Sequence, residues 1–157
     1  MSRRDEEVKK AILSLLTSQQ LAALSTQRDG QPYTSLMAFA HTQDLKYLVV
    51  ATGKATRKHH NILHDARVSL LIDNRANSED DFHAAMALTV LGKAQPVEES
   101  EQASYEGLYL RRHPYLEKFL ASPTTAFIKV EVYHYLLVSR FQKVMEYRIR
   151  DDFDLFS

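Results

Sequence analysis

Three apolar segments with strand composition follow one another near the start of the chain, and the turns between them restrict the folds it can adopt. The segments are LAALST (residues 21–26), YTSLMAFAHT (33–42) and LKYLVVAT (45–52). Asp29-Gly30 separates the first two. This dipeptide is the strongest short-range hairpin signal because both positions tolerate a positive φ. The sequence therefore predicts an antiparallel meander at the start of the fold.

Further strand-like segments occupy the middle and the end of the chain. RVSLLID (67–73) and ALTVLGKAQPV (87–97) are joined by a polar, acidic loop, and AFIKVEVYHYLLVS (126–139) alternates, with residues 141–149 expected to return beside it. Strict alternation would place on one side Phe127, Lys129, Glu131, Tyr133 and Tyr135, and on the other Ile128, Val130, Val132 and His134. About six or seven antiparallel strands, interrupted by helices, favour a mainly β fold, a β-barrel with flanking helices, over a parallel α/β sheet.

Helical periodicity appears in two places. Behind the charged start, apolar residues recur at helical spacing, namely Val8, Ile12, Leu15 and Leu16. They predict an amphipathic helix over residues 4–17 that lays one face on the core. A second helical face is formed by Tyr105, Leu108, Tyr109 and Arg112. Pro114 predicts the end of that helix, and YLEKFL (115–120) predicts a further short one.

Composition restricts the cellular setting and the partners. A chain of 157 residues has the size of one domain, with the helix in residues 1–18 and the barrel with its helical insertions in 19–157. Basic and acidic residues number 20 each, so no overall charge favours nucleic acid or a membrane as a partner. Cysteine is absent, which excludes disulfides and thiolate catalysis. Neither a signal peptide nor a spanning helix fits the N-terminal segment, and we expect a cytoplasmic protein.

The segment VVATGKATRKHHNIL (49–63) is basic although the whole chain is neutral. It contains Lys54, Arg57 and Lys58, and no Asp or Glu occurs between residues 45 and 64. An anion bound by this chain must therefore be held by local charge. The two commonest glycine-rich nucleotide loops, GxGxxG and GxxxxGK[ST], do not occur in the sequence.

Thr56 is a suitable N-cap for a short helix that begins at Arg57. Cations in the first turn oppose the helix macrodipole unless an anion lies beside them. Free N–H groups, the hydroxyl of Thr52 or Thr56, a bidentate Arg57 and Lys58 would together form a phosphate-monoester site. The alternative is a solvated basic turn that pairs with the acidic residues 79–81 of the same or a neighbouring chain.

Several motifs stand in a characteristic order along the chain. Thr52, Thr56, Arg57 and Lys58 lie between KYLVVA and HHNIL, after the hairpin LAALST with DGQPYTSLMAFA, and before RVSLLID and ALTVLGKAQPVEES. This order, over nearly the whole chain, resembles the pyridoxamine 5′-phosphate oxidase-related proteins, in which the strand-loop-helix segment binds FMN. RRHPYLEKFL and LVSRFQKV further resemble the branch of that family that includes haem-utilisation proteins.

The resemblance implies a split β-barrel homodimer with two FMN sites, each where the chains meet. Arg57 and Lys58 would hold the phosphate, Thr56 would cap the helix, and Phe141 with the helix around Tyr109 would cover the flavin ring. The cofactor-binding residues carried over by position are Ser35, Leu36, Met37, Ala51, Thr52, Lys54, Thr56, Arg57 and Lys58. The implied function is a flavin-dependent oxidoreductase that acts on a small molecule, with an electron donor or substrate as its further partner.

The chain also departs from the family pattern. Ser35 stands where the vitamin-synthesising enzymes carry an Arg, Ala40 stands near their Lys, and Ala87 stands near their flavin-contacting Gln. The arginine and histidine pair that grips the pyridoxal substrate is not evident in EYRIRDDFDLFS. We therefore do not expect a true pyridoxamine 5′-phosphate oxidase.

Three alternatives remain open from the sequence. The first is a non-catalytic flavin or haem carrier or sensor, or a haem-utilisation protein, with His113 and His134 as candidate ligands. The second is a deazaflavin in place of FMN, because both present phosphate to a similar basic pocket. The third is a metal at His60 and His64, which stand one helical turn apart. No Glu follows the first of them as a metalloprotease requires, and we expect no metal.

Overall fold

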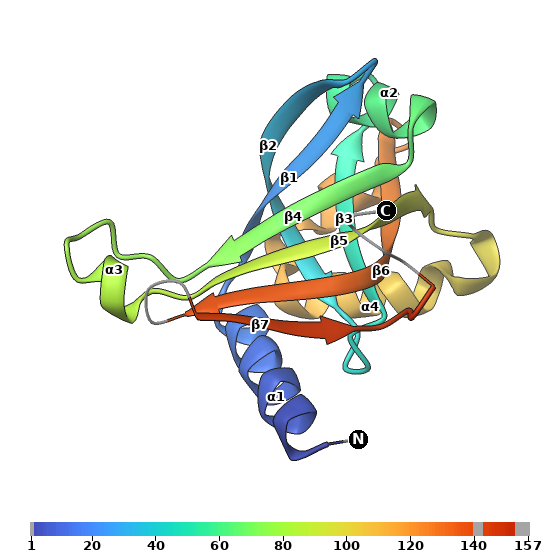
Figure 1. Ribbon diagram of the computed structural model, residues 1–157. Helices are drawn as coiled ribbons and strands as arrows, with labels where there is room; N and C mark the ends of the chain where they lie inside the picture. Colours follow the sequence, from blue (N-terminus) through green and yellow to red (C-terminus); the bar gives the residue numbers. More distant parts are fainter. Residues whose placement is uncertain (1, 140–142, 153–157) are drawn as a thin grey trace.

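The computed structural model describes residues 2–139 and 143–152. In this part of the chain the strands are β1 (Leu21–Arg28), β2 (Gln31–His41), β3 (Tyr47–Gly53), β4 (Arg67–Asp73), β5 (Ala87–Pro96), β6 (Thr125–Ser139) and β7 (Lys143–Arg148). Their order in the sheet is β3-β2-β1-β4-β5-β6-β7, and β3 also pairs with β6, so the first six strands close into an antiparallel barrel (Figure 1). The predicted mainly β barrel is confirmed. Residues 141–142 of the predicted return strand lie outside the described residues.

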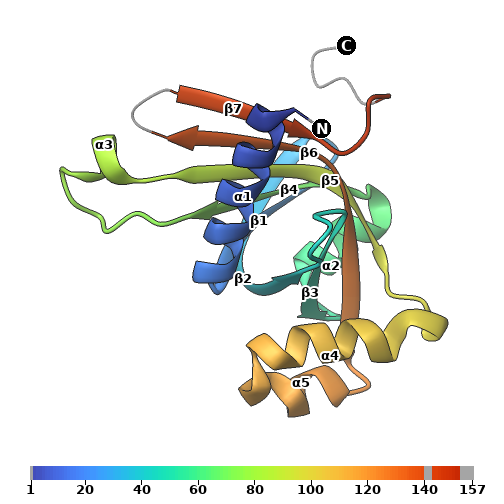
Figure 2. The same cartoon turned by 90° about the horizontal axis from the view of Figure 1, so that it is seen from below.

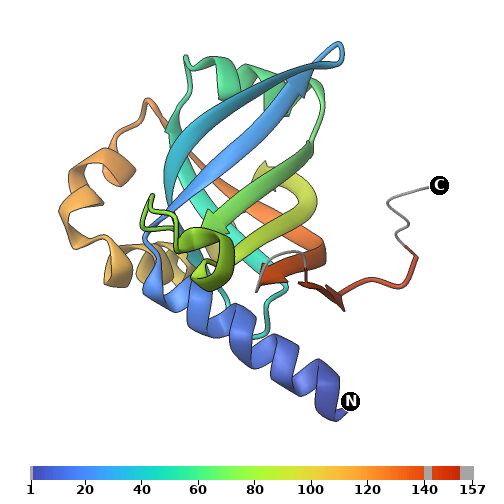
Figure 3. The same ribbon diagram turned by 60° about the vertical axis from the view of Figure 1, so that its left-hand side comes forward.

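Most of the helices cover both ends and one side of the barrel, and one short helix lies in the loop between β4 and β5 (Figure 1). They are α1 (Arg3–Ser18), α2 (Arg57–His64), α3 (Asp81–Ala84), α4 (Gln102–Arg112) and α5 (Glu117–Ala121). α1 and α2 lie at opposite ends of the barrel (Figures 1 and 3). α4 and α5 form a separate layer against β2, β3 and β6 (Figure 2). Among the described residues, no helix is long and apolar enough to span a membrane.

The β1–β2 hairpin forms as the sequence predicted. Asp29 and Gly30 occupy its turn with φ values of 51° and 83°, and Arg28 pairs with Gln31 directly before the turn. Both turn residues therefore have the positive φ that a two-residue type I′ turn requires. The hairpin extends beside α2 at the same end of the barrel (Figure 1).

Buried apolar side chains form two clusters, one on each side of the sheet. The larger cluster fills the barrel and includes the predicted face of α1, namely Val8, Ile12, Leu15 and Leu16. The smaller cluster lies between the outer face of the barrel and the α4–α5 layer, and consists of Ala40, Val49, Ala51, Val97, Tyr109, Leu120 and Phe127. The hydrophobic effect therefore fixes both the closing helix and the side layer to the barrel.

The RRHP motif has a structural role at the end of α4. The guanidinium group of Arg112 donates to the carbonyl oxygen of Leu16 at 3.0 Å and to that of Gln19. These acceptors lie at the C-terminus of α1, where a cation is favoured by the macrodipole. His113 is fully buried, and its Nε2 lies 2.7 Å from the carbonyl oxygen of Phe39. The motif thereby ties α4 to α1 and to β2.

β6 does not alternate strictly, because a β-bulge interrupts it. Leu91 of β5 pairs with His134, whereas the next residue along β5 pairs with Val132, so Tyr133 is the extra residue. Val132 and Tyr135 both lie in the core of the barrel. The predicted faces were therefore wrong beyond the bulge: Tyr135 points into the barrel and His134 points out.

Gly92 lies opposite this bulge, where the two backbones approach closely. A Cβ atom at Gly92 would lie 2.2 Å from the carbonyl oxygen of Glu131, whereas a Cβ atom at Gly107 of α4 would meet no atom within 4 Å. We predict that Gly92→Ala lowers the free energy of unfolding by about 2 kcal/mol, because the backbone must shift to admit the methyl group. Gly107→Ala is the matched control, and should be neutral or gain about 0.5–1 kcal/mol as a helix substitution. Urea unfolding measures both, and an unchanged midpoint for Gly92→Ala would contradict the close approach.

Candidate functional site

α2 begins at Arg57 behind the N-cap Thr56, as the sequence predicted. The Oγ1 atom of Thr56 accepts a hydrogen bond from the N–H of His59 at 3.3 Å, and it lies 3.0 Å from the hydroxyl oxygen of Thr52. The first amides of a helix, here those of Arg57 and Lys58, have no intrahelical acceptor. They are therefore available to an anion at this end of the helix.

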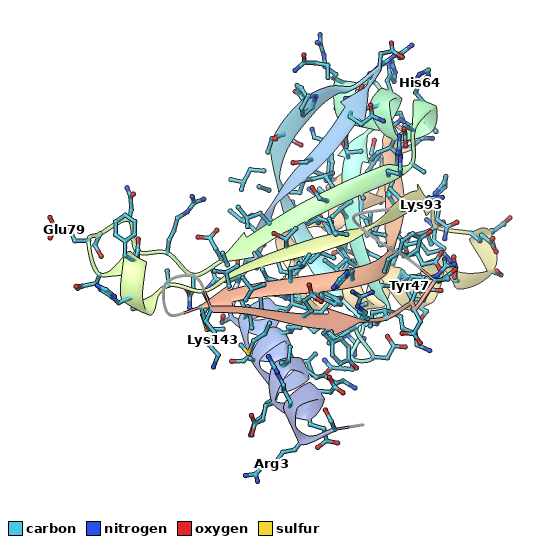
Figure 4. The ribbon with its side chains drawn as sticks, viewed as in Figure 1. Arg3, Tyr47, His64, Glu79, Lys93 and Lys143 are labelled. Atoms are coloured by element: carbon cyan, nitrogen blue, oxygen red, sulfur yellow. The ribbon has the colours of Figure 1, made fainter. Side chains whose placement is uncertain are left out.

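The β1–β2 hairpin lies beside α2 and is tied to it at two points. The buried side-chain amide of Asn61 donates to the hydroxyl of Thr26 at 3.1 Å. His64 Nε2 lies 3.3 Å from a carboxylate oxygen of Asp29 in the hairpin turn. Figure 4 shows His64 at the end of α2, next to the tip of the hairpin. Helix and hairpin therefore form two walls of fixed spacing.

A cleft of about 670 Å³ lies between these walls, and we call it the α2–hairpin cleft. Its lining residues are Arg28, Gln31, Pro32, Tyr33, Ala55, Arg57, His60 and Asn61. The guanidinium carbon of Arg57 lies 5.9 Å from the centre of the Tyr33 ring. No carboxylate is among the described residues that line the cleft. The volume is typical of small-molecule sites, and the two guanidinium groups favour an anionic ligand.

Asp65 follows directly after α2, and its carboxylate is neutralised by Arg67 rather than by the arginines of the cleft. Asp65 accepts a hydrogen bond from Arg67 at 2.7 Å and another from the side chain of Gln27. The Arg67 guanidinium holds the pKa of the Asp65 carboxyl well below its usual range. Within the described part of the chain, Arg28 and Arg57 form no ion pair. Their charges therefore remain directed at the cleft.

The acidic loop of the same chain does not neutralise the basic segment. Asp81 accepts hydrogen bonds from the backbone N–H groups of Ala76 at 2.8 Å and Ser78 at 3.0 Å, so it stabilises its own loop. Figure 4 places Glu79 and His64 at well-separated ends of the molecule. The intramolecular form of the alternative, a basic turn paired with residues 79–81, is therefore wrong.

The predicted cofactor residues fall into separate places in the structure. Thr52, Thr56, Arg57 and Lys58 surround the start of α2. Lys54 instead lines a second cleft of about 570 Å³ between α2 and α5. Of the predicted cofactor residues, only Arg57 lines the α2–hairpin cleft.

The other predicted residues lie on β2 and β3. Ser35 and Met37 pair with the core residues Leu24 and Ala22 across β1, so their side chains are directed into the barrel. Leu36 points out and is 69% exposed. Only the backbone at Ser35 and Met37 is therefore available to a ligand outside the barrel.

Ala51, expected to line the flavin, and the side chains expected to cover its ring are not among the described residues that line this cleft. Ala51 and Tyr109 both belong to the apolar cluster beneath the α4–α5 layer. Burial raises the pKa of the Tyr109 hydroxyl to about 12, which fits a core position. Phe141 lies outside the described residues.

Sequence reasoning missed Arg28 and Tyr33, which line the cleft from the hairpin wall. Both lie within four residues of the Asp29-Gly30 turn. The predicted hairpin could have indicated that they lie close together. The sequence gives no signal that this hairpin lies beside α2, because the contact depends on tertiary packing.

The two candidate haem ligands are buried. His113 is fully buried and its Nε2 is engaged by the Phe39 carbonyl oxygen. His134 is 2% exposed, and burial lowers its pKa while Glu146, with an oxygen 3.7 Å from Nε2, opposes that shift. Neither imidazole is accessible to a haem in this conformation. Among the described residues, no three His, Asp or Glu side chains gather as metal ligands.

Comparison with known proteins yields one family and a shared fold. A family profile described as pyridoxamine 5′-phosphate oxidase matches residues 8–139, while no curated protein sequence matches the chain. A structure of a heme binding protein from Mycobacterium smegmatis has a TM-score of 0.79 and 17% identity. The alignment covers 94% of this chain, which spans only 59% of that longer protein.

Two further structures have similar lengths. A FAD-binding protein from Mesorhizobium loti has a TM-score of 0.66 and 15% identity, with 82% of this chain and 90% of that chain covered. General Stress Protein 26 from Bacillus anthracis has a TM-score of 0.63 and 21% identity, with 91% and 99% covered. At these identities the likeness shows the fold alone.

Proposed function

The chain belongs to the pyridoxamine 5′-phosphate oxidase family, and from this premise we propose that it binds FMN with the phosphate at the start of α2. The observation that carries the proposal is the α2–hairpin cleft, which combines the start of a helix, the guanidinium group of Arg57 and no lining carboxylate among the described residues. Helix N-termini and arginine forks are the usual ligands of a phosphate monoester. The fold neighbour described as a FAD-binding protein supports a flavin.

Each residue of the site has a separate task in binding. Arg57 and Lys58 would neutralise the phosphate, whose charge is close to −2 at neutral pH. Thr56 would hold the loop and the helix start in place through its bonds to Thr52 and His59. The flavin ring would then lie along the backbone of residues 35–37, on the outer face that Leu36 exposes. The donor set therefore fits the phosphate end of FMN.

We assign the chain the role of a flavin-dependent oxidoreductase acting on a small molecule. When bound, the flavin supplies the redox chemistry, and the protein supplies binding, orientation and electrostatics. The described residues lining the cleft include no acid and no nucleophilic Ser or Lys, which fits a protein that orients a redox cofactor. The vitamin-synthesising enzymes carry an Arg, a Lys and a Gln where this chain has Ser35, Ala40 and Ala87. These replacements distinguish the chain from those enzymes.

Removal of the two cations tests the phosphate site. We predict that Arg57→Ala with Lys58→Ala weakens FMN binding at least about 100-fold, because charge-assisted hydrogen bonds contribute about 1.5–3 kcal/mol each. The urea midpoint should change little, because Arg57 is exposed and Lys58 is only partly buried. Arg111→Ala with Lys118→Ala, on the exposed α4–α5 layer, removes the same charge and serves as the control. Quenching of FMN fluorescence measures the dissociation constants, and equal values for both double variants would refute the assignment.

The outer face of the barrel supports the expected homodimer. One cross-strand row on this face consists of Leu36, Ala23, Leu71, Thr89 and Leu136. The exposed fractions on this face reach 69% for Leu36, 48% for Leu21, 38% for Leu71 and 36% for Val138. Contiguous exposed apolar surface marks interaction sites. Since Leu36 belongs to it, a second copy seated here would place the flavin ring where two chains meet.

Charged substitutions on this face test the dimer. We predict that the wild-type protein is a dimer by multi-angle light scattering, and that Leu36→Asp with Leu71→Asp is a folded monomer, because two buried carboxylates would be left unpaired. Leu63→Asp changes a similarly exposed leucine (64%) on α2, away from this face, and should remain dimeric. A wild-type monomer, or a double variant that stays dimeric, would rule out this interface.

The second candidate function is a non-catalytic carrier of flavin or haem. It is favoured by the fold neighbour described as a heme binding protein, but the burial of His113 and His134 removes the expected ligands. We predict that the purified protein binds FMN and, with FMN bound, oxidises a nicotinamide donor. When haemin is added to the protein, we expect no Soret band of a haem complex. A flavin-loaded protein inert to donors would indicate a carrier, and haemin uptake without FMN uptake would overturn the flavin assignment.

A further inference from the structure

The α2–hairpin cleft continues beyond the helix start to the hairpin turn, farther than one phosphate requires. Arg28, in the last residue pair before the turn, lines it from the wall opposite Arg57. A volume of about 670 Å³ is enough for most of a drug-sized ligand. From this we infer that the distal end of the cleft binds a second phosphate and an adenine ring, so that the preferred cofactor is FAD rather than FMN. The inference rests on the proposed function, because the first phosphate is the one held at Arg57.

Charge supports a second phosphate. Two guanidinium groups line one cleft from opposite walls, and the described residues that line it provide no carboxylate to neutralise them. The adjacent acids are engaged, since Asp65 accepts from Arg67 and Asp29 lies 3.3 Å from His64. A pyrophosphate carries two charged groups in series, and each would meet one cation across the cleft. A monophosphate would leave the charge of Arg28 unneutralised.

The shape of the hairpin wall supports an adenine. Tyr33 lines the cleft and is 39% exposed, with the Arg57 guanidinium carbon 5.9 Å from its ring centre. Tyrosine rings and arginine planes are the surfaces on which bases stack. Gln31 lies beside Tyr33, and its side-chain nitrogen donates to the Pro32 carbonyl oxygen at 3.1 Å, which leaves its side-chain oxygen for the amino group of adenine. The wall therefore offers a stacking surface and a polar edge contact.

The test compares three probes, namely FMN, FAD and ADP, in calorimetric titrations of the full-length protein. We expect FAD to bind at least tenfold more tightly than FMN. Arg28→Ala should abolish that advantage and the binding of ADP, while it leaves the dissociation constant of FMN unchanged. Arg28→Lys should restore part of the advantage, and Tyr33→Ala should weaken FAD and ADP several-fold more than FMN. Arg111→Ala, which changes an exposed arginine of α4, is the control for loss of charge.

The outcomes separate this inference from the proposed function. Tight FMN binding with no preference for FAD would overturn the inference and leave the flavin site intact. Equal weakening of FMN and FAD in Arg28→Ala would also overturn it, because Arg28 would then act on the whole site. Absence of binding by both flavins would overturn the proposed function and the inference together.

Discussion

Closure of the barrel by β6 is the constraint on which the rest of the structure depends. This one strand pairs with β3, β5 and β7, and the bulge at Tyr133 inverts its faces. A bulge bends the strand and increases its local twist, so β6 can leave β7 and reach β3. The close approach at Gly92 is a consequence of this bend. Because β3 is fixed by closure, the loop after it delivers α2 to the mouth of the barrel beside the hairpin.

The electrostatics of the candidate site follow from this geometry. Asn61 and His64 tie α2 to the hairpin, and Arg67 neutralises Asp65, the carboxylate that follows α2. What remains at the cleft is a helix N-terminus with cations, an arrangement that is unfavourable by itself and favourable around an anion. This arrangement supports the proposal that the site binds a phosphate.

Local features could be predicted from the sequence, and assemblies between distant segments could not. The hairpin at Asp29-Gly30 and the N-cap Thr56 were predicted because a turn and a helix end are decided by a few adjacent residues. The faces of β6 were predicted wrongly because the bulge is set by pairing with β5. Lys54 and Arg57 are three residues apart, yet they line different clefts. Only the packing of α2 against its neighbours determines which cleft each side chain lines. Arg28 joins the site through that same packing.

The most direct measurement of the central claim is a comparison of FMN with riboflavin, which lacks the phosphate. Both are titrated into the purified protein while flavin fluorescence is recorded. If the start of α2 holds the phosphate, FMN should bind at least about 100-fold more tightly than riboflavin, since two charge-assisted contacts are lost with the phosphate. Equal affinities for FMN and riboflavin would show that the basic segment does not bind the phosphate, and would contradict the account.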